Sequence, residues 1–168
     1  ILELFHGPTL AFKDFAARFM ARCIEYLLDN EITILVATSG DTGSAVASGF
    51  FGIEGIRVVI LYPSNRVSMM QEKQLTTMGN NITALEINGT FDDCQNMVKK
   101  AFIDKTLREK ILLSSANSIN IARLLPQSVY YAWASRKVME NHPVAFSVPC
   151  GNFGNITGGI FAKRMGFP

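Results

Sequence analysis

Hydrophobic positions along the chain fall into two alternating patterns, one typical of buried strands and one typical of helices. The run ITILVA at residues 32–37 is almost continuously aliphatic, which is typical of a parallel strand that is buried on both faces. Further strands are expected at residues 56–62, 82–87 and 145–149. Each run leads through a turn into a segment with helical character, so strands and helices alternate along the chain.

The helical segments follow these strands and also precede the first one. The helix expected before the first strand places four residues on one face at helical spacing: Phe15, Phe19, Cys23 and Leu27. In the helix expected to run to about residue 140, Pro126 should lie in the first turn or at a kink. Strands and helices that alternate in this way predict an α/β fold with a doubly wound, mostly parallel sheet and right-handed crossovers. Helices are expected at residues 12–28, after the turn at 39–43, at 68–79, at 91–109, from the segment 114–123 to about residue 140, and up to residue 165.

Composition narrows the class of protein. The 168 residues are 48% hydrophobic and only 18% charged, which fits one compact domain or a piece of a larger one and excludes a disordered chain. The net charge is +2 and no basic stripe is interleaved with aromatic residues, so no nucleic-acid partner is expected. Residues 143–162 carry no charge but contain several glycines and asparagines, so no membrane helix is expected.

Cysteine and histidine usage bears on location and metal binding. Three cysteines lie far apart in the sequence and there are only two histidines. This pattern predicts neither a disulfide framework nor a metal site, and reduced thiols in the cytoplasm are the simplest interpretation. Three aromatic residues of the helix expected near residue 130 are interpreted as core rather than as a ligand site; they are Tyr130, Tyr131 and Trp133.

Two glycine-containing turns each follow a predicted strand and open a helix. Ligands of open α/β sheets bind at such turns, where helix N-termini present free N–H groups to anions. The turn SGDTG at residues 39–43 is either an anion-binding loop or a helix start capped by Asp41 or Thr42. The turn GNFGN at residues 151–155 is either a phosphate-binding loop or a structural turn.

A third polar cluster and one lysine complete the candidate chemistry. Asn117, Ser118 and Arg123 are close enough in sequence to face one oxyanion, the alternative being a helix cap with a solvated arginine. Lys13 lies among aromatic residues at an expected helix start, where it either reaches water or is held dry. A dry lysine loses part of its preference for the charged form and can form a Schiff base. A Schiff-base lysine, a phosphate loop and a separate anion site together suit pyridoxal phosphate chemistry.

Four stretches in order carry a resemblance to a known family: LFHGPTLAFKDF, ATSGDTGSA, SANSINIARLLPQ and VPCGNFGNITGG. At these residues the chain resembles the threonine synthase family of the fold-type II pyridoxal 5'-phosphate enzymes. The resemblance implies a lyase that converts O-phospho-L-homoserine and water to L-threonine and phosphate. It further implies a fragment with a Lys-bearing small α/β subdomain over residues 1–142 and the start of a larger cofactor-binding domain over 143–168. As an isolated fragment it is expected to be inactive.

The same resemblance implies roles for individual residues. Lys13 would be the Schiff-base lysine and would also move protons, while Asp41 would lie beside the cofactor ring hydroxyl. Many fold-type II relatives have Asn where this chain has Asp41, and the resemblance with Asp indicates the threonine synthase branch. Residues that would hold the cofactor phosphate are Gly151, Asn152, Phe153, Gly154 and Asn155. Substrate would be bound at its carboxylate by Thr38, Ser39 and Thr42, and at its phosphate by Asn117, Ser118 and Arg123.

Two other functions fit the same motifs. A serine or threonine dehydratase-like lyase would share the cofactor residues but would have no substrate phosphate to bind. A noncatalytic Rossmann-like fragment would share the fold and bind no cofactor. The oligomeric state is left open by the sequence.

Overall fold

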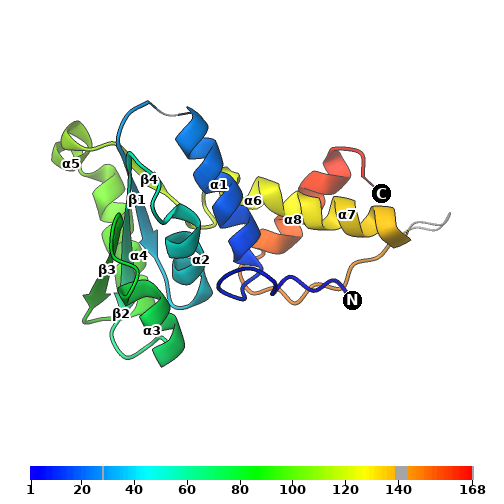
Figure 1. Cartoon of the computed structure of the whole chain (residues 1–168), viewed down its shortest axis with the longest axis horizontal. Helices are drawn as coiled ribbons and strands as arrows, with labels where there is room; N and C mark the ends of the chain where they lie inside the picture. The colour runs from blue at the N-terminus through cyan, green and yellow to red at the C-terminus, as the bar shows by residue number, and fades with distance from the viewer. Residues whose placement is uncertain (28, 139–143, 168) are drawn as a thin grey trace.

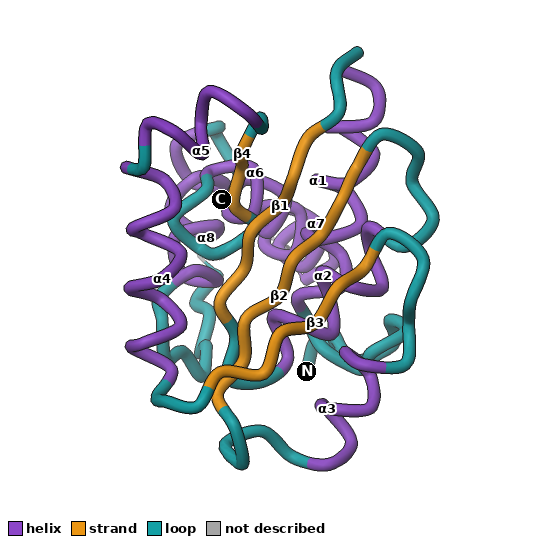
Figure 2. The backbone as a smooth tube through the Cα atoms, turned by 90° about the vertical axis from the view of Figure 1, so that its left-hand side faces the viewer, coloured by secondary structure: helices purple, strands orange, loops and turns teal. Residues whose placement is uncertain are grey.

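The structure, a computed structural model, describes residues 1–27, 29–138 and 144–167. Its centre is a four-stranded parallel sheet with the strand order β3-β2-β1-β4 (Figure 2). The strands are β1 (Ile32–Ala37), β2 (Ile56–Pro63), β3 (Ile82–Ile87) and β4 (Leu113–Ser115). Because all four run in one direction, their carboxyl ends meet at the same edge of the sheet.

Helices make up most of the remaining elements, and some of them cover the two faces of this sheet. They are α1 (Lys13–Leu27), α2 (Asp41–Phe50), α3 (Met69–Thr76), α4 (Phe91–Ile103), α5 (Lys105–Lys110), α6 (Ile121–Leu124), the 3-10 turn η1 (Leu125–Gln127), α7 (Ser128–Val138) and α8 (Gly154–Arg164). Helices α1, α2 and α3 lie on one side of the sheet and α4 lies on the other (Figure 2). The expected doubly wound α/β fold is confirmed.

The core has one part on each face of the sheet. The larger part joins the inward side chains of β1 and β2, such as Ile34 and Val58, to Met20 of α1 and Phe50 of α2. The smaller part joins Leu35, Ala37 and Leu61 to Cys94 and Val98 of α4. Strands whose alternate residues are buried on opposite faces read as continuous apolar runs, which is why the pattern at 32–37 was informative.

Three elements differ from the expectation. The helix expected over 91–109 is broken at Asp104, whose extended backbone leaves α4 and whose side chain accepts a hydrogen bond from the Leu107 N–H to cap α5. Residues 113–115, which include the first two residues of the polar segment at 114–123, pair with β1 as the edge strand β4, and the sequence did not predict this strand. Residues 145–149 form no strand within the described residues; there Phe146 packs edge-on against Tyr131 of α7.

Helix α1 buries a different face from the one its large residues suggested. Its small residues Ala17 and Ala21 pack inward with Met20, whereas Phe19 is 56% exposed. Phe15 and Phe19 line an apolar groove of about 570 Å³ together with the N-terminal segment and α7. Small inward residues allow α1 to approach α2 closely, which leaves the aromatic side chains on the outer side.

The aromatic group on α7 is also split. Tyr130 and Tyr131 are buried, as expected for core residues, but Trp133 is 55% exposed and the expectation is wrong for it. Pro126 lies in η1, the 3-10 turn between α6 and α7, so it falls directly before the first turn of α7. Figure 1 shows α7 and α8 extending away from the sheet on the side where both chain ends lie.

Some predicted boundaries fall on residues that the structure does not describe. The ends expected at residues 28 and 140 and the boundary at 142/143 fall outside those residues, so the division into 1–142 and 143–168 stays a prediction. Among the helices described, none is both long enough and apolar enough to cross a membrane.

Candidate active site

Lys13 is the first residue of α1 and its side chain is 26% exposed. The loop before it is fixed by Asp14, which is buried and accepts hydrogen bonds from the Thr9 N–H at 2.9 Å and the Thr9 hydroxyl at 2.5 Å. The Tyr130 hydroxyl of α7 donates to the Phe12 carbonyl at 2.7 Å. The residues directly before and after Lys13 are therefore both fixed by hydrogen bonds, which sets the position of the Lys13 backbone.

The amine of Lys13 is under opposing influences. Burial lowers its pKa below the ordinary lysine value, the nearby Asp41 carboxylate opposes this shift, and the Arg123 guanidinium adds to it. The distance from the Lys13 Nζ to the Asp41 Oδ2 is 3.9 Å, and the Phe12 ring centroid lies 5.2 Å from Nζ. The net direction is downward, which favours the neutral amine that nucleophilic chemistry needs.

The loop at 38–42 is built by Thr38. The Thr38 hydroxyl is buried, donates to the Gly40 carbonyl at 2.8 Å, and accepts from the N–H groups of Gly40 and Gly43 at 3.1 and 2.9 Å. The N-cap residue of α2 is Gly40, and the first-turn N–H of Gly43 is bonded by Thr38, so the interpretation of Asp41 or Thr42 as the helix cap is wrong. The N–H groups of the first two residues of α2 are left at the carboxyl edge of the sheet, with Ser39 exposed beside them.

Arg123 lies on α6 and is only 4% exposed, so it is not the solvated arginine of the alternative interpretation. Its Nη1 donates to the Ala116 carbonyl, and its Nε has no hydrogen-bond partner within the described residues. Burial lowers the pKa of the guanidinium to about 10. A buried cation with an unused donor is costly unless an anion completes its environment.

The two polar neighbours of Arg123 in sequence are placed differently. The Asn117 amide is used by β1, because its Oδ1 accepts from the Ala37 N–H at 3.1 Å and its Nδ2 donates to the Ala37 carbonyl at 2.7 Å. Ser118 is exposed and lies near the start of α8, since a Cβ built on Gly154 would be 3.9 Å from the Ser118 Cβ. Ser118 thus meets the GNFGN turn, whereas Asn117 joins β4 to β1.

The turn at 151–155 forms the N-terminus of α8. Phe153 has a left-handed backbone with a φ of 55°, and among the described residues no side chain caps the helix. Gly151, Asn152 and Phe153 are exposed, and the Asn155 Oδ1 accepts a hydrogen bond from the Tyr131 hydroxyl. An uncapped helix start after a tight turn fits a phosphate group.

Sequence reasoning missed two residues at this site. Tyr131 was assigned to the core only, and its hydroxyl bonds to Asn155 across 24 residues of sequence. Gln71 of α3 donates from its Nε2 to the Asp41 Oδ1 at 2.7 Å. The Ser68–Gln71 spacing marks a capping box that the sequence does display, but nothing in the sequence indicates its contact with Asp41.

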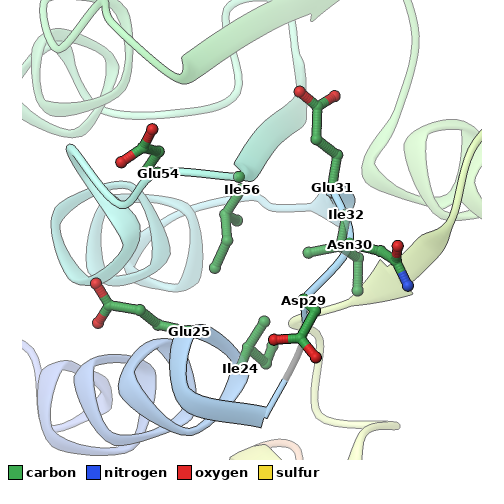
Figure 3. A pocket seen from close by; sticks show the side chains of 9 residues that line it. Ile24, Glu25, Asp29, Asn30, Glu31, Ile32, Glu54 and Ile56 are labelled. Carbon is green, nitrogen blue, oxygen red and sulfur yellow. The ribbon is translucent and has the colours of Figure 1, made fainter.

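A second cleft, of about 180 Å³, lies at the opposite end of the sheet. Figure 3 shows Ile32 and Ile56, the first residues of β1 and β2, facing Ile24 from the last turns of α1. Its rim carries the carboxylates Glu25, Asp29, Glu31 and Glu54. Because Lys13 and the open helix starts of α2 and α8 are at other positions in the fold, the candidate site does not include this cleft.

This geometry agrees with comparisons to known proteins. A family described as "Pyridoxal-phosphate dependent enzyme" matches residues 2–168, and the chain belongs to this family. It is 56% identical over 170 residues to a threonine synthase of Buchnera aphidicola from Acyrthosiphon pisum, covering 99% of this chain and 40% of that protein.

Solved structures give the same family and fold. The crystal structure of threonine synthase from Escherichia coli has a TM-score of 0.91 at 52% identity, over 99% of this chain and 40% of that one. The structure of pyridoxal phosphate-bound threonine synthase from Brucella melitensis has a TM-score of 0.90 at 48% identity, over 100% of this chain and 37% of that one. The chain therefore spans about two fifths of the length of these relatives.

The residues present fit the cofactor that the family name states. A lysine with a lowered pKa suits the cofactor aldehyde, and the uncapped start of α8 suits its phosphate. The Gly151 Cα also has open space around it, since a Cβ built there would have no atom within 4 Å in the described structure.

Proposed function

We propose that the protein containing this chain is a threonine synthase that releases phosphate from O-phospho-L-homoserine and forms L-threonine with water. The observation that carries the proposal is the placement of Lys13 beside Asp41 and within the electrostatic reach of the buried Arg123. The identity of 44–56% to several curated threonine synthases supports the same substrate.

Lys13 would carry the cofactor through its amine, and the GNFGN turn would hold the cofactor phosphate through Gly151, Asn152, Phe153, Gly154 and Asn155. When bound, pyridoxal 5'-phosphate withdraws electrons from the substrate carbons near the amino group. Lys13 would also accept and donate protons at those carbons, because its lowered pKa leaves more of the neutral amine available. Asp41, 3.9 Å from the amine, would stabilise its protonated form and lie beside the cofactor ring.

The open N-terminus of α2 would bind the substrate carboxylate, with Ser39 and Thr42 at its start and Thr38 shaping the loop from inside. Arg123 would bind the substrate phosphate, because its buried guanidinium has an unused Nε and a planar donor array that matches phosphate. Ser118 lies at the start of α8 and would contribute a hydroxyl to the same anion, while Asn117 would hold the segment against β1.

A dehydratase-like lyase is the second candidate, and Arg123 distinguishes the two. A dehydratase releases water and has no leaving phosphate, so a buried cation beside the reactive lysine would have no partner. The cation favours the phosphorylated substrate.

The test uses the full-length enzyme. Phosphate and threonine should form from O-phospho-L-homoserine, with little keto acid from L-threonine or L-serine. Arg123→Lys should reduce phosphate release strongly while the visible absorbance of the bound cofactor remains. Efficient keto acid formation without phosphate release would support the dehydratase, and absence of any cofactor absorbance would support the noncatalytic fragment.

The location in the cytoplasm is also a proposal. It is supported by the three separated cysteines Cys23, Cys94 and Cys150, all of which are free thiols in the structure.

A further inference from the structure

Gln71 lies in the first turn of α3, a helix that contributed no residue to the predicted site. Its Nε2 donates to the Asp41 Oδ1 at 2.7 Å, and the other carboxylate oxygen, Oδ2, lies 3.9 Å from the Lys13 Nζ. The Asp41 carboxylate therefore bridges Gln71 and Lys13.

The amide of Gln71 is held in one orientation by the cap of its own helix. Its Oε1 accepts from the Ser68 N–H at 3.2 Å and from the Ser68 hydroxyl at 3.0 Å. An amide whose oxygen is engaged in this way presents its two N–H donors on the other side. Asp41 faces those donors, and a carboxylate can only accept.

The first turn of α3 contacts the first turn of α2. A Cβ on Gly40 would lie 3.0 Å from the Gln71 Nε2, and the φ of Gly40 is 170°, an extended value open to any residue. A side chain at position 40 would therefore press on the Gln71 amide and displace it by a few tenths of an ångström. Leu75, one turn further along α3, is buried, and a Cβ on Gly43 would lie 2.8 Å from its Cδ2.

We propose that Gln71 is a positioning residue that holds the Asp41 carboxylate in the orientation facing Lys13. The Asp41 side chain is half exposed, and without the Gln71 donor it turns towards water. The inference rests on the proposed role of Lys13 as the reactive amine and is independent of the substrate. It gives α3 a function at the site in addition to its packing.

The experiment measures the protonation midpoint of Lys13 in the full-length enzyme freed of cofactor. Trace acetylation with acetic anhydride over a series of pH values, followed by peptide mass spectrometry, reports this midpoint. Gln71→Met keeps the side-chain length and removes the donor, so the midpoint should fall by about half a pH unit, as in Asp41→Asn. In the Asp41→Asn background, Gln71→Met should cause no further fall.

Ser68→Ala is the matched control. It removes one of the two donors to the Gln71 Oε1, while the backbone N–H of residue 68 remains and keeps the amide nitrogen turned towards Asp41, so the midpoint should be unchanged. Equal shifts in Ser68→Ala and Gln71→Met would show that the cap alone matters, and an unchanged midpoint in Gln71→Met would show that Asp41 needs no positioning; either result overturns the proposal. Failure of the proposed function would instead appear as absence of phosphate release from the wild-type enzyme.

Discussion

At the scale of single residues, the site depends on a lysine whose surroundings oppose each other. Burial and Arg123 favour the neutral amine of Lys13, whereas Asp41 favours the charged form. A fully dry lysine would lack a partner when protonated, and a fully solvated one would be charged at neutral pH. The partly buried position beside one carboxylate allows both forms.

We expect Lys13 to lose its proton at a lower pH than an ordinary lysine side chain in water, because burial lowers its pKa. The folded-state pKa of Lys13 is depressed below its unfolded value because burial disfavours the charged amine. The free energy of unfolding should therefore be highest above the unfolded pKa and should decrease as pH falls through the folded pKa and the amine becomes charged. Acetylation midpoints of Lys13 in the folded apoenzyme and in the same enzyme unfolded by denaturant measure the difference. A folded-state midpoint at or above the unfolded-state midpoint would show that the surroundings do not favour the neutral amine.

Tyr131→Phe is expected to weaken cofactor binding. The hydroxyl of Tyr131 donates to the Asn155 Oδ1, and one hydrogen bond typically contributes about 1 kcal/mol. The dissociation constant for pyridoxal phosphate should rise about fivefold, measured by absorbance titration of the full-length apoenzyme. Tyr26→Phe, at an exposed tyrosine of α1, is the matched control and should leave the affinity unchanged. Unchanged affinity in Tyr131→Phe would show that Asn155 is held by other contacts.

At the scale of helices and strands, α8 is positioned by close backbone contact. A Cβ on Gly158 would lie 2.9 Å from the Gln127 carbonyl carbon and 3.1 Å from the Ser128 nitrogen. Gly158→Ala should therefore separate α8 from η1 and α7 and lower the free energy of unfolding by about 1–3 kcal/mol, despite the higher helix propensity of alanine. Urea unfolding measures the free energy of unfolding, with Lys163→Ala at an exposed position of α8 as the control. A Gly158→Ala protein that is more stable than the wild type would show that the backbone at residues 127 and 128 moves to make room for the methyl group.

The strands at 32–37 and 56–62 were predictable because burial on both faces leaves a nearly continuous apolar pattern. The strand at 82–87 lies at the edge of the sheet with only Ile82 buried, and its mostly apolar residues indicated it. The edge strand at 113–115 was not, because its pairing with β1 depends on Thr33 and Leu35, about 80 residues earlier. At the site, Lys13 and the two glycine-containing turns have local signatures. The contacts of Gln71 and Tyr131 join residues 30 and 24 positions apart, so only the fold brings them together.

At the scale of the whole molecule, the 168 residues contain the candidate lysine and phosphate turn but only about two fifths of the length of the relatives. The apolar groove of about 570 Å³ beside α1 and α7 remains open, with Phe19, Val129 and Trp133 on its lining. We expect residues 1–168, expressed as a separate polypeptide, to bind an apolar dye in this groove. The same polypeptide is expected to release no phosphate from O-phospho-L-homoserine. Dye fluorescence and a phosphate assay against the full-length enzyme check both, and turnover by the short polypeptide would contradict the expectation.

Borohydride reduction shows which lysine carries the cofactor, the role proposed for Lys13. Reduction of the full-length enzyme with bound pyridoxal phosphate fixes the cofactor to its lysine, and peptide mass spectrometry identifies that residue. The added mass is expected on the peptide that contains Lys13 and should disappear in Lys13→Ala. Addition to any other lysine, or an unaltered pattern in Lys13→Ala, would contradict this role.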